Sequence, residues 1–322
     1  MSKKILFINN PHYNHSSATL LEGLIENKEE YDLELYCTTP YNYAMIKDRW
    51  DYVVYSKESV EKLVDVCDVV VLVNDGYSPK AEVPFAVRKE KGVYLDSNDH
   101  AEYLDSPINY KFYLKREMRI DMEHLENVFP FWFAAENRYF YRGRDFEEIW
   151  NNKKTPLACM MGIDEMKPWR KEISEILKWT FEHRTDFILD PVYGGNDDSA
   201  LDTSGRSHSA FFDALVDSRV SIDSYGAGLA NNTGRFFESI ACGCALFYQP
   251  ITTHLANPFT NDENIVIYDS TARLVEKING IIDDDEKLKE IAYAGFNHVL
   301  SYHTTKRRGY EFLELCKGFN LI

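Results

Sequence analysis

Residues 234–249 read GRFFESIACGCALFYQ and place two cysteines two positions apart, shortly after a charged pair. Cys242 and Cys244 form a lone C-x-C, whereas structural zinc sites bring two pairs of cysteine or histidine ligands and redox dithiols favour C-x-x-C. No second pair is apparent in the sequence. We therefore interpret both thiols as small packing residues and predict a protein without a bound metal.

Arg235 and Glu238 are the residues of this run that could bind a polar ligand. The apolar residues between and after them recur at spacings of three and four, which predicts a helix from about Thr233, and they are Phe236, Phe237, Ile240 and Ala241. Gly243 then predicts the end of the helix. Arg235 and Glu238 share the opposite face, either as a surface ion pair or as ligand-binding groups.

A loop rich in glycine and asparagine, SYGAGLANNTG at 224–234, leads from a predicted strand into this helix. Free backbone N–H groups and the helix dipole favour anions at such a helix start. A diphosphate would fit against the backbone around Asn232, Thr233 and Gly234. The alternative is a plain turn, since most glycine-rich loops between strand and helix are only turns.

Polar residues also follow the predicted strands of the first half. Asp99 and His100, in DSNDH, combine a carboxylate with an imidazole that titrates near neutral pH, which suits proton transfer. His12, in the loop after the first predicted strand, is a second candidate. Turn residues are the alternative interpretation, because Asp and Asn are common in turns. Lys115, in YKFYLKRE, lines the same edge or merely ends a strand.

Apolar runs that alternate with helical patterns position these residues. Predicted strands of the first half are KKILFINN, DLELYCT, DVVVLVND and GVYLDSND. After an aromatic and charged stretch at about 128–156, the alternation resumes with PLACMMGI, TDFILDPV, VSIDSY and ENIVIYDS. The pattern predicts an α/β protein with parallel sheets, and ligands bind such sheets at the carboxyl ends of the strands.

The chain has 322 residues, with 52 acidic and 36 basic side chains and a formal net charge of −16. This balance argues against a partner bound through a phosphate backbone, which needs clustered Lys and Arg. No apolar run approaches the ~20 residues of a membrane span, and the first apolar run is too short for a signal peptide. Six scattered cysteines form no disulfide framework. We therefore expect a cytoplasmic protein without a membrane span.

The second half carries an ordered set of motifs. They are the Arg-x-x-Glu helix that ends in Ala-Cys-Gly, the strand IVIYDS, an Asp-rich turn, the helix AYAGFNHVL and the segment YHTTKRR. Together they span about residues 205–315. As a set they resemble the C-terminal domain of group 1 glycosyltransferases of the spore-maturation-protein (CgeB-like) type.

The resemblance implies the GT-B fold, in which two Rossmann-like, doubly wound parallel-sheet domains face each other across a cleft. It implies transfer of a sugar from a nucleoside diphosphate sugar, a UDP-sugar by preference, to an acceptor hydroxyl, with no metal or other cofactor. Glu238 would bond the ribose hydroxyls, Arg235 would face the diphosphate, and Lys167 or Arg170 would offset the charge of the leaving diphosphate. A solvated helix start is the alternative for the last two.

In this fold the first domain holds the acceptor, and the last helix crosses back to it. The resemblance therefore implies an acceptor domain at 1–150, completed by a helix at about 304–322, and a nucleotide-sugar domain at 151–303. Asp99, His100 and His12 become candidates for the base that takes the proton of the acceptor hydroxyl. We expect a glycan, a protein or a small molecule as acceptor rather than nucleic acid.

One position departs from the family pattern. Many retaining relatives carry a second glutamate eight residues before the ribose glutamate, and this chain has Ala230 there. Both retaining and inverting chemistry therefore stay open. Two other functions also stay open: a DNA-base (hydroxymethyl-pyrimidine) glycosyltransferase of phage type, against which the net charge counts, and a non-catalytic GT-B protein that binds a nucleotide or sugar.

Overall fold

The structure is a computed structural model that describes residues 2–8, 15–37, 53–55, 60–74, 83–98, 101–122, 125–135, 145–163, 167–189, 212–226 and 233–322. The chain divides into two compact units. Unit 1 comprises Met1–Ala134, Thr252–Leu255 and Thr304–Ile322, and unit 2 comprises Ala135–Ile251 and Ala256–His303. Unit 2 thus begins before the boundary placed at 150 from the sequence.

Unit 1 is built on a sheet of seven parallel strands in the order β3-β2-β1-β4-β5-β6-β7. The strands are β1 (Lys3–Ile8), β2 (Leu33–Cys37), β3 (Val53–Tyr55), β4 (Val69–Asn74), β5 (Gly92–Asp96), β6 (Phe112–Lys115) and β7 (Val128–Pro130). Strands β4 and β5 are buried along their whole length, which explains their continuous apolar sequences. The strands predicted in the first half are confirmed.

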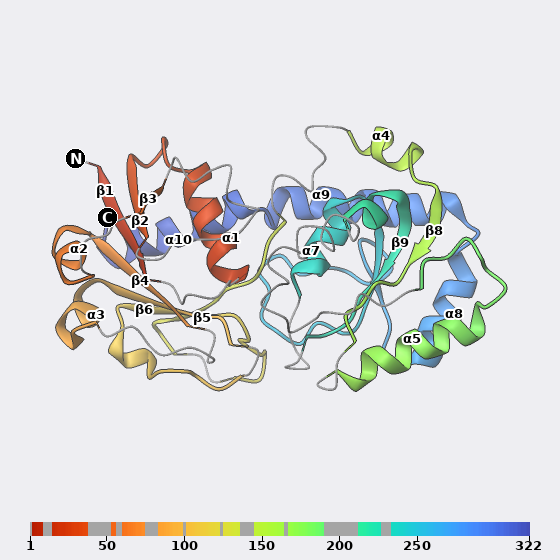
Figure 1. Cartoon of the computed structure of the whole chain (residues 1–322), viewed down its shortest axis with the longest axis horizontal. Helices are drawn as coiled ribbons and strands as arrows, with labels where there is room; N and C mark the ends of the chain where they lie inside the picture. Colours follow the sequence, from red (N-terminus) through yellow and green to blue (C-terminus); the bar gives the residue numbers. More distant parts are fainter. Residues whose placement is uncertain are drawn as a thin grey trace. The chain divides into compact units, whose positions relative to one another are not determined.

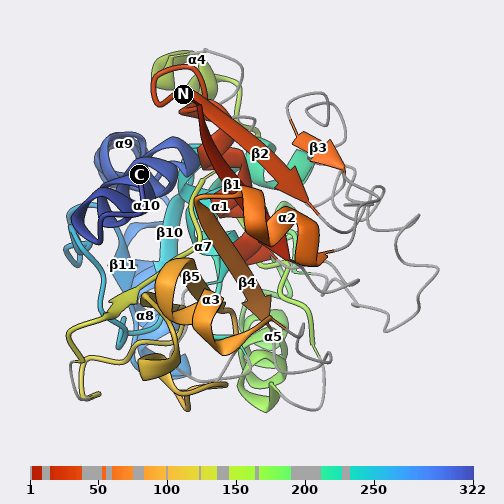
Figure 2. The same ribbon diagram turned by 90° about the vertical axis from the view of Figure 1, so that its left-hand side faces the viewer.

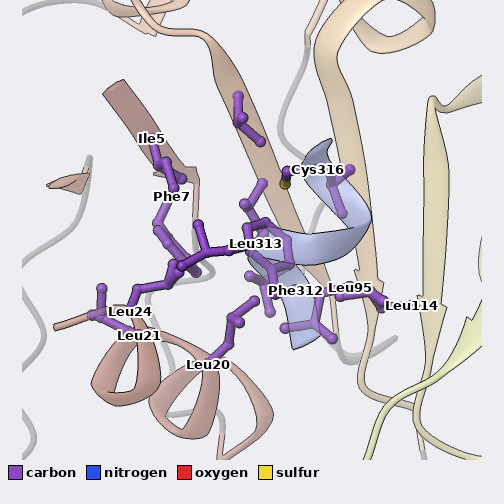
Figure 3. Close-up of a cluster of buried hydrophobic side chains, with 14 of the residues drawn as sticks. Ile5, Phe7, Leu20, Leu21, Leu24, Leu95, Leu114, Phe312, Leu313 and Cys316 are labelled. Carbon is purple, nitrogen blue, oxygen red and sulfur yellow. The ribbon is translucent and has the colours of Figure 1, made fainter. Parts of the chain in front are cut away.

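Helices cover both faces of this sheet (Figures 1 and 2). The helices are α1 (His15–Glu26), α2 (Val60–Val66), α3 (Phe85–Lys91), the 3-10 helix η2 (Pro107–Asn109) and α10 (Thr305–Gly318). Helices α1 and α10 share one buried cluster with the strands, and α2 packs on the opposite face. Figure 3 shows leucines of α1 and residues of α10 gathered against β1, β5 and β6. The sheet is therefore doubly wound.

Helix α10 packs tightly on α1, so the end of the chain belongs to unit 1. A Cβ added to Gly309 would lie 2.3 Å from the carbonyl group of Gly23, so the two backbones meet without side chains between them. Asn27 donates from Nδ2 to the carbonyl oxygen of Lys306 at 2.9 Å. The run SSATLLEGLIEN predicts a Ser at the N-cap of α1, and this prediction is wrong, because the helix begins at His15, before Ser16 and Ser17.

Unit 2 contains a parallel sheet of four strands in the order β11-β10-β9-β8. The strands are β8 (Thr155–Ala158), β9 (Ser218–Ile222), β10 (Ala245–Tyr248) and β11 (Val266–Ile267). The predicted strand TDFILDPV is not found over its described part, where only Ile188 forms a bridge, with Ala158. A turn in which Arg184 binds Asp186 brings the chain to the sheet for this single pairing.

The helices described in unit 2 include α4 (Phe146–Asn151), α5 (Pro168–Thr180), α7 (Gly234–Ala241), α8 (Thr271–Ile281) and α9 (Asp285–Tyr302) (Figure 1), and residues 212–217 are helical as well. The acidic run at 283–285 caps α9, since the Asp284 side chain accepts a hydrogen bond from the backbone N–H of Lys287 at 3.0 Å. Acidic residues just before EKLKEIAYAG are typical of helix capping, and this hydrogen bond confirms that interpretation. Over the described residues, no helix is long and apolar enough to cross a membrane.

Candidate functional site

Helix α7 carries the residues that the sequence marks for ligand binding. Phe236 and Phe237 are fully buried, which fixes the apolar face predicted from their spacing. Thr233 is the N-cap, the helix ends at Ala241 with Cys242 as the C-cap, and Gly243 follows with a φ of 74°. Glycine adopts this left-handed conformation at no steric cost, so the predicted helix and its end are confirmed.

The carboxylate of Glu238 lies at the amino end of α7. Its side chain is directed toward the first turn, because a Cβ built on Gly234 would lie 3.6 Å from Glu238 Oε1. Helical side chains tilt toward the amino end, so a residue in the second turn reaches the first. Glu238 is only 5% exposed. The Glu238 carboxylate, which can accept hydrogen bonds from hydroxyl groups, therefore lies within one helical turn of a helix start that favours anions.

Arg235 is the cation of this region, and it is paired with a residue that the sequence analysis did not single out. Its Nη2 atom lies 3.3 Å from Oδ1 of Asp223, and its Nη1 donates to the carbonyl oxygen of Met160 at 3.4 Å. The Thr233 hydroxyl donates to Oδ2 of Asp223 at 2.6 Å. Asp223 thus connects the end of β9 to the first turn of α7, and its place directly after a buried strand was the available signal.

A small hollow lies where these groups meet. Its walls are formed by Ala158, Met160, Leu215, Ser221, Ile222, Asp223, Arg235 and Ser239. The hollow is therefore at the carboxyl ends of β8 and β9, beside α7. Ser221 and Ser239 share a hydrogen bond of 3.0 Å that fixes the helix to the strand. Open α/β sheets bind their ligands at this edge.

Arg170 holds the segment that follows β9. Its guanidinium is 3% exposed, and it donates from Nε and Nη2 to the carbonyl oxygen of Tyr225 at 2.9 and 2.6 Å and from Nη2 to that of Ser224 at 3.1 Å. The Tyr268 hydroxyl donates to the carbonyl oxygen of Asp223 at 2.9 Å. The backbone at 223–225 is thus supported from two sides. Lys167, just before α5, is partly exposed.

The two cysteines lie at the opposite end of α7 and are buried. The ammonium of Lys153 donates to the carbonyl oxygen of Cys242 at 2.8 Å, at the carboxyl end of the helix. Burial raises the pKa of the Cys244 thiol. All six cysteines are buried free thiols, so the packing interpretation is confirmed. Among the described residues, no group of three His, Cys, Asp or Glu side chains is placed to hold a metal ion.

The acceptor-side candidates His12, Asp99 and His100 lie outside the described residues, as do Asn232 and Ala230. The structure does describe charged groups next to two of them, at the carboxyl ends of β5 and β6. Asp96 Oδ2 lies 3.1 Å from the Lys115 ammonium, and neither side chain is exposed. The sequence analysis left two roles open for Lys115, and the structure buries it in an ion pair.

The carboxylate of Asp96 is also bonded on both oxygens. It accepts from the backbone N–H groups of Asn98 and Leu104, each at 3.1 Å, and from the hydroxyl of Tyr113. Lys115 donates to the carbonyl oxygen of Glu102 at 2.8 Å. Burial raises the pKa of Tyr113, which keeps the phenol protonated as a donor. Asp96 and Lys115 therefore hold both ends of the segment 97–104.

Glu117, two residues after β6, is a further charged group that sequence reasoning missed. Its side chain is 1% exposed, with Oε1 3.8 Å from Nε of Arg116. Burial raises the pKa of Glu117 from 4.5 to about 7, against the opposing effect of nearby Arg116 and Lys115. From the sequence alone, a polar residue after a strand is expected to be exposed, and only the fold shows that Glu117 is buried.

Solved structures identify the fold. The chain is similar to a glycosyltransferase from Rickettsia africae, with a TM-score of 0.63 and 11% identity over 99% of this chain and 98% of the other. It is similar to the Anabaena protein HepE in complex with UDP and glucose, with a TM-score of 0.58 and 10% identity over 98% and 100% of the two chains. It is similar to an alpha-glucosyltransferase in complex with UDP, with a TM-score of 0.62 and 10% identity over the same shares. The chain therefore has the GT-B fold, with two Rossmann-like parallel-sheet units.

A comparison with protein-family models also matches part of the sequence. Residues 193–314 match the protein-family model described as glycosyl transferase-like, and this segment includes α7 with Arg235 and Glu238. A comparison with curated proteins finds no match. The likeness to glycosyltransferases expected from the motifs is confirmed at this level, whereas the spore-maturation type stays a prediction.

Proposed function

We propose that the protein is a glycosyltransferase that moves a sugar from a nucleoside diphosphate sugar to an acceptor hydroxyl. One observation carries the proposal. Within the segment matched by the family model, the Glu238 carboxylate is directed toward the first turn of α7, and Arg235 of that turn lines a hollow at the strand ends. This arrangement offers separate groups for the two chemical parts of a nucleotide donor, its diphosphate and its ribose.

The donor contacts follow from the chemistry of these groups. The N–H groups at Thr233 and Gly234, with those of the preceding loop around Asn232, face the diphosphate, and Arg235 adds a full positive charge. The Glu238 carboxylate accepts hydrogen bonds from the 2′ and 3′ hydroxyls of the ribose. Two structural neighbours are complexes with UDP, and we infer a UDP-sugar as the donor.

Departure of the nucleoside diphosphate requires stabilisation of its growing negative charge. The helix start, Arg235 and Lys167 supply positive potential for this, so the proposed reaction needs no metal ion or other cofactor. Arg170 supports departure of the diphosphate indirectly, because its hydrogen bonds to the carbonyl oxygens of Ser224 and Tyr225 hold the backbone next to the proposed donor site.

The acceptor side belongs to unit 1 in this proposal. In the sequence, Asp99 and His100 come after β5 and His12 comes after β1, and ligands of such sheets bind at the carboxyl ends of the strands. If the reaction inverts the anomeric centre, one of these three residues takes the proton of the acceptor hydroxyl. The ion pair of Asp96 and Lys115 anchors the segment that carries the first two.

Isothermal titration with UDP and GDP, in buffer containing EDTA, tests the donor site. We expect UDP to bind without metal and Glu238→Gln to weaken binding about tenfold or more, because the amide removes the charge from a hydrogen bond to the ribose. Glu276→Gln, on the exposed face of α8 in the same unit, is the matched control and should bind normally. If no nucleoside diphosphate binds and UDP-sugars are not hydrolysed, the proposal is wrong.

A further inference from the structure

Asp223 is a buried carboxylate at the site where the proposed donor places its diphosphate. The residue is 2% exposed and lines the hollow together with Arg235. Its two oxygens differ. Oδ2 accepts the Thr233 hydroxyl at 2.6 Å, whereas Oδ1 accepts no hydrogen bond from the described residues and lies 3.3 Å from the Arg235 guanidinium. Arg235 therefore does not offer its whole charge to a ligand.

A diphosphate at the start of α7 would bring further negative charge beside this carboxylate. Like charges in a partly desolvated site repel more strongly than in water. Arg235 lies next to both, so the Asp223 carboxylate and the phosphate oxygens compete for one guanidinium. The effect on binding of the nucleoside diphosphate is unfavourable, even though Asp223 keeps Arg235 and Thr233 in place.

The fold around Asp223 does not depend on its negative charge. The backbone N–H of Asp223 donates to the carbonyl oxygen of Phe247 at 3.1 Å, and its own carbonyl oxygen accepts from the Tyr268 hydroxyl at 2.9 Å. Arg170 holds the next two carbonyl groups. An asparagine in this position keeps an oxygen for Thr233. The negative charge of Asp223 is therefore not needed to hold the local backbone in place.

We propose that Asp223 lowers the affinity of the donor site for the nucleoside diphosphate, so that this product is released after transfer. The inference rests on the proposed function and adds a control of affinity to it. Asp223 is a positioning residue for Arg235 and Thr233, and the same carboxylate sets an upper limit on how tightly the site retains phosphate groups. A site without this carboxylate would hold its product longer.

Titration of Asp223→Asn with UDP and with uridine tests the inference. Uridine has the same base and ribose but no phosphate, so it separates the charge effect from damage to the site. We expect the variant to bind UDP several-fold more tightly than the natural protein, with a steeper loss of affinity as salt is added, and to bind uridine unchanged. Stronger product inhibition by UDP should accompany this.

Asp217→Asn is the matched control, because Asp217 immediately precedes β9 whereas Asp223 immediately follows it. It should leave UDP binding unchanged. Asp223→Ser provides a second neutral variant with an oxygen for Thr233, in case the asparagine variant folds poorly. Equal weakening of UDP and uridine in the neutral variants would show a purely structural role and overturn the inference alone. Failure of the natural protein to bind UDP would overturn the proposed function and this inference together.

Discussion

Two pairs of opposite charge occupy comparable places in the two units. Asp96 is the last residue of β5 in unit 1, and Asp223 directly follows β9 in unit 2. The first is paired with Lys115, with both side chains fully buried, and the second with Arg235, whose side chain is 22% exposed. Both pairs therefore lie at the edge where α/β sheets bind ligands, but their carboxylate oxygens differ in how many hydrogen bonds they accept.

The difference lies in how completely each carboxylate is bonded. Asp96 accepts bonds on both oxygens, from Asn98, Leu104 and Tyr113 as well as Lys115. Asp223 has one oxygen that accepts no hydrogen bond within the part of the chain that the structure describes. Lys115 stands on the strand next to β5, in register with Asp96, whereas Arg235 reaches over from a helix. The comparison suggests that unit 1 uses its edge charges for structure and unit 2 uses them for a ligand.

Removal of the buried cation in unit 1 should produce the largest effect. We expect Lys115→Met to lower the free energy of unfolding by about 3–5 kcal/mol, because it leaves the Asp96 carboxylate buried without its counter-charge. Urea unfolding followed by circular dichroism measures this. The double variant Asp96→Asn with Lys115→Met should recover part of the loss. A Lys115→Met variant as stable as the natural protein would break the comparison.

Glu117, which follows β6 in unit 1, should make the free energy of unfolding depend on pH. Its pKa is raised from 4.5 to about 7 by burial, so the folded protein binds this proton more tightly than the unfolded chain. Stability from this group is greatest below pH 4.5 and falls as the pH rises toward 7, after which a constant penalty of about 3 kcal/mol remains.

Glu117→Gln should remove this penalty. We expect the variant to be more stable than the natural protein by up to about 3 kcal/mol at pH 8 and equally stable at pH 4, since the neutral amide resembles the protonated acid. Thermal unfolding across this pH range measures the difference. Glu90→Gln, on the exposed part of α3, should show no such trend. A Glu117→Gln gain that does not depend on pH would contradict the assignment.

The sequence predicts most of the framework of this comparison. Alternating apolar runs predict both parallel sheets, and the spacing of Phe236 and Phe237 predicts α7 and the face that carries Arg235 and Glu238. A strand was wrongly expected at TDFILDPV, where the apolar pattern is present but only Ile188 pairs with the sheet over its described part. Periodicity reports which residues can be buried, and it does not report whether a partner strand is within reach.

The partners of the edge charges could not be predicted in the same way. The pairing of Asp96 with Lys115 depends on the register of β5 and β6, and that of Asp223 with Arg235 depends on how α7 packs over β9. Both are long-range consequences of the fold. Glu117 follows a strand, where a polar residue is expected to be exposed, and its burial becomes visible only in the folded chain. Local patterns therefore predicted helix α7 but not the carboxylate that pairs with Arg235.

Arg235→Met should have the smallest effect on stability and so sharpens the comparison most directly. The Arg235 side chain is 22% exposed, so water can reach the Asp223 carboxylate once the guanidinium is removed, and the methionine side chain retains the apolar contacts of the arginine stem. We expect the loss in free energy of unfolding, measured with urea, to be clearly smaller than that of Lys115→Met, while affinity for UDP falls by about tenfold or more through loss of a charged hydrogen bond to phosphate. Lys115→Met provides the opposite control, with a large loss of stability. If Arg235→Met instead unfolds the protein and Lys115→Met does not, the edge charges of unit 2 are the structural ones and the assignment of roles must be reversed.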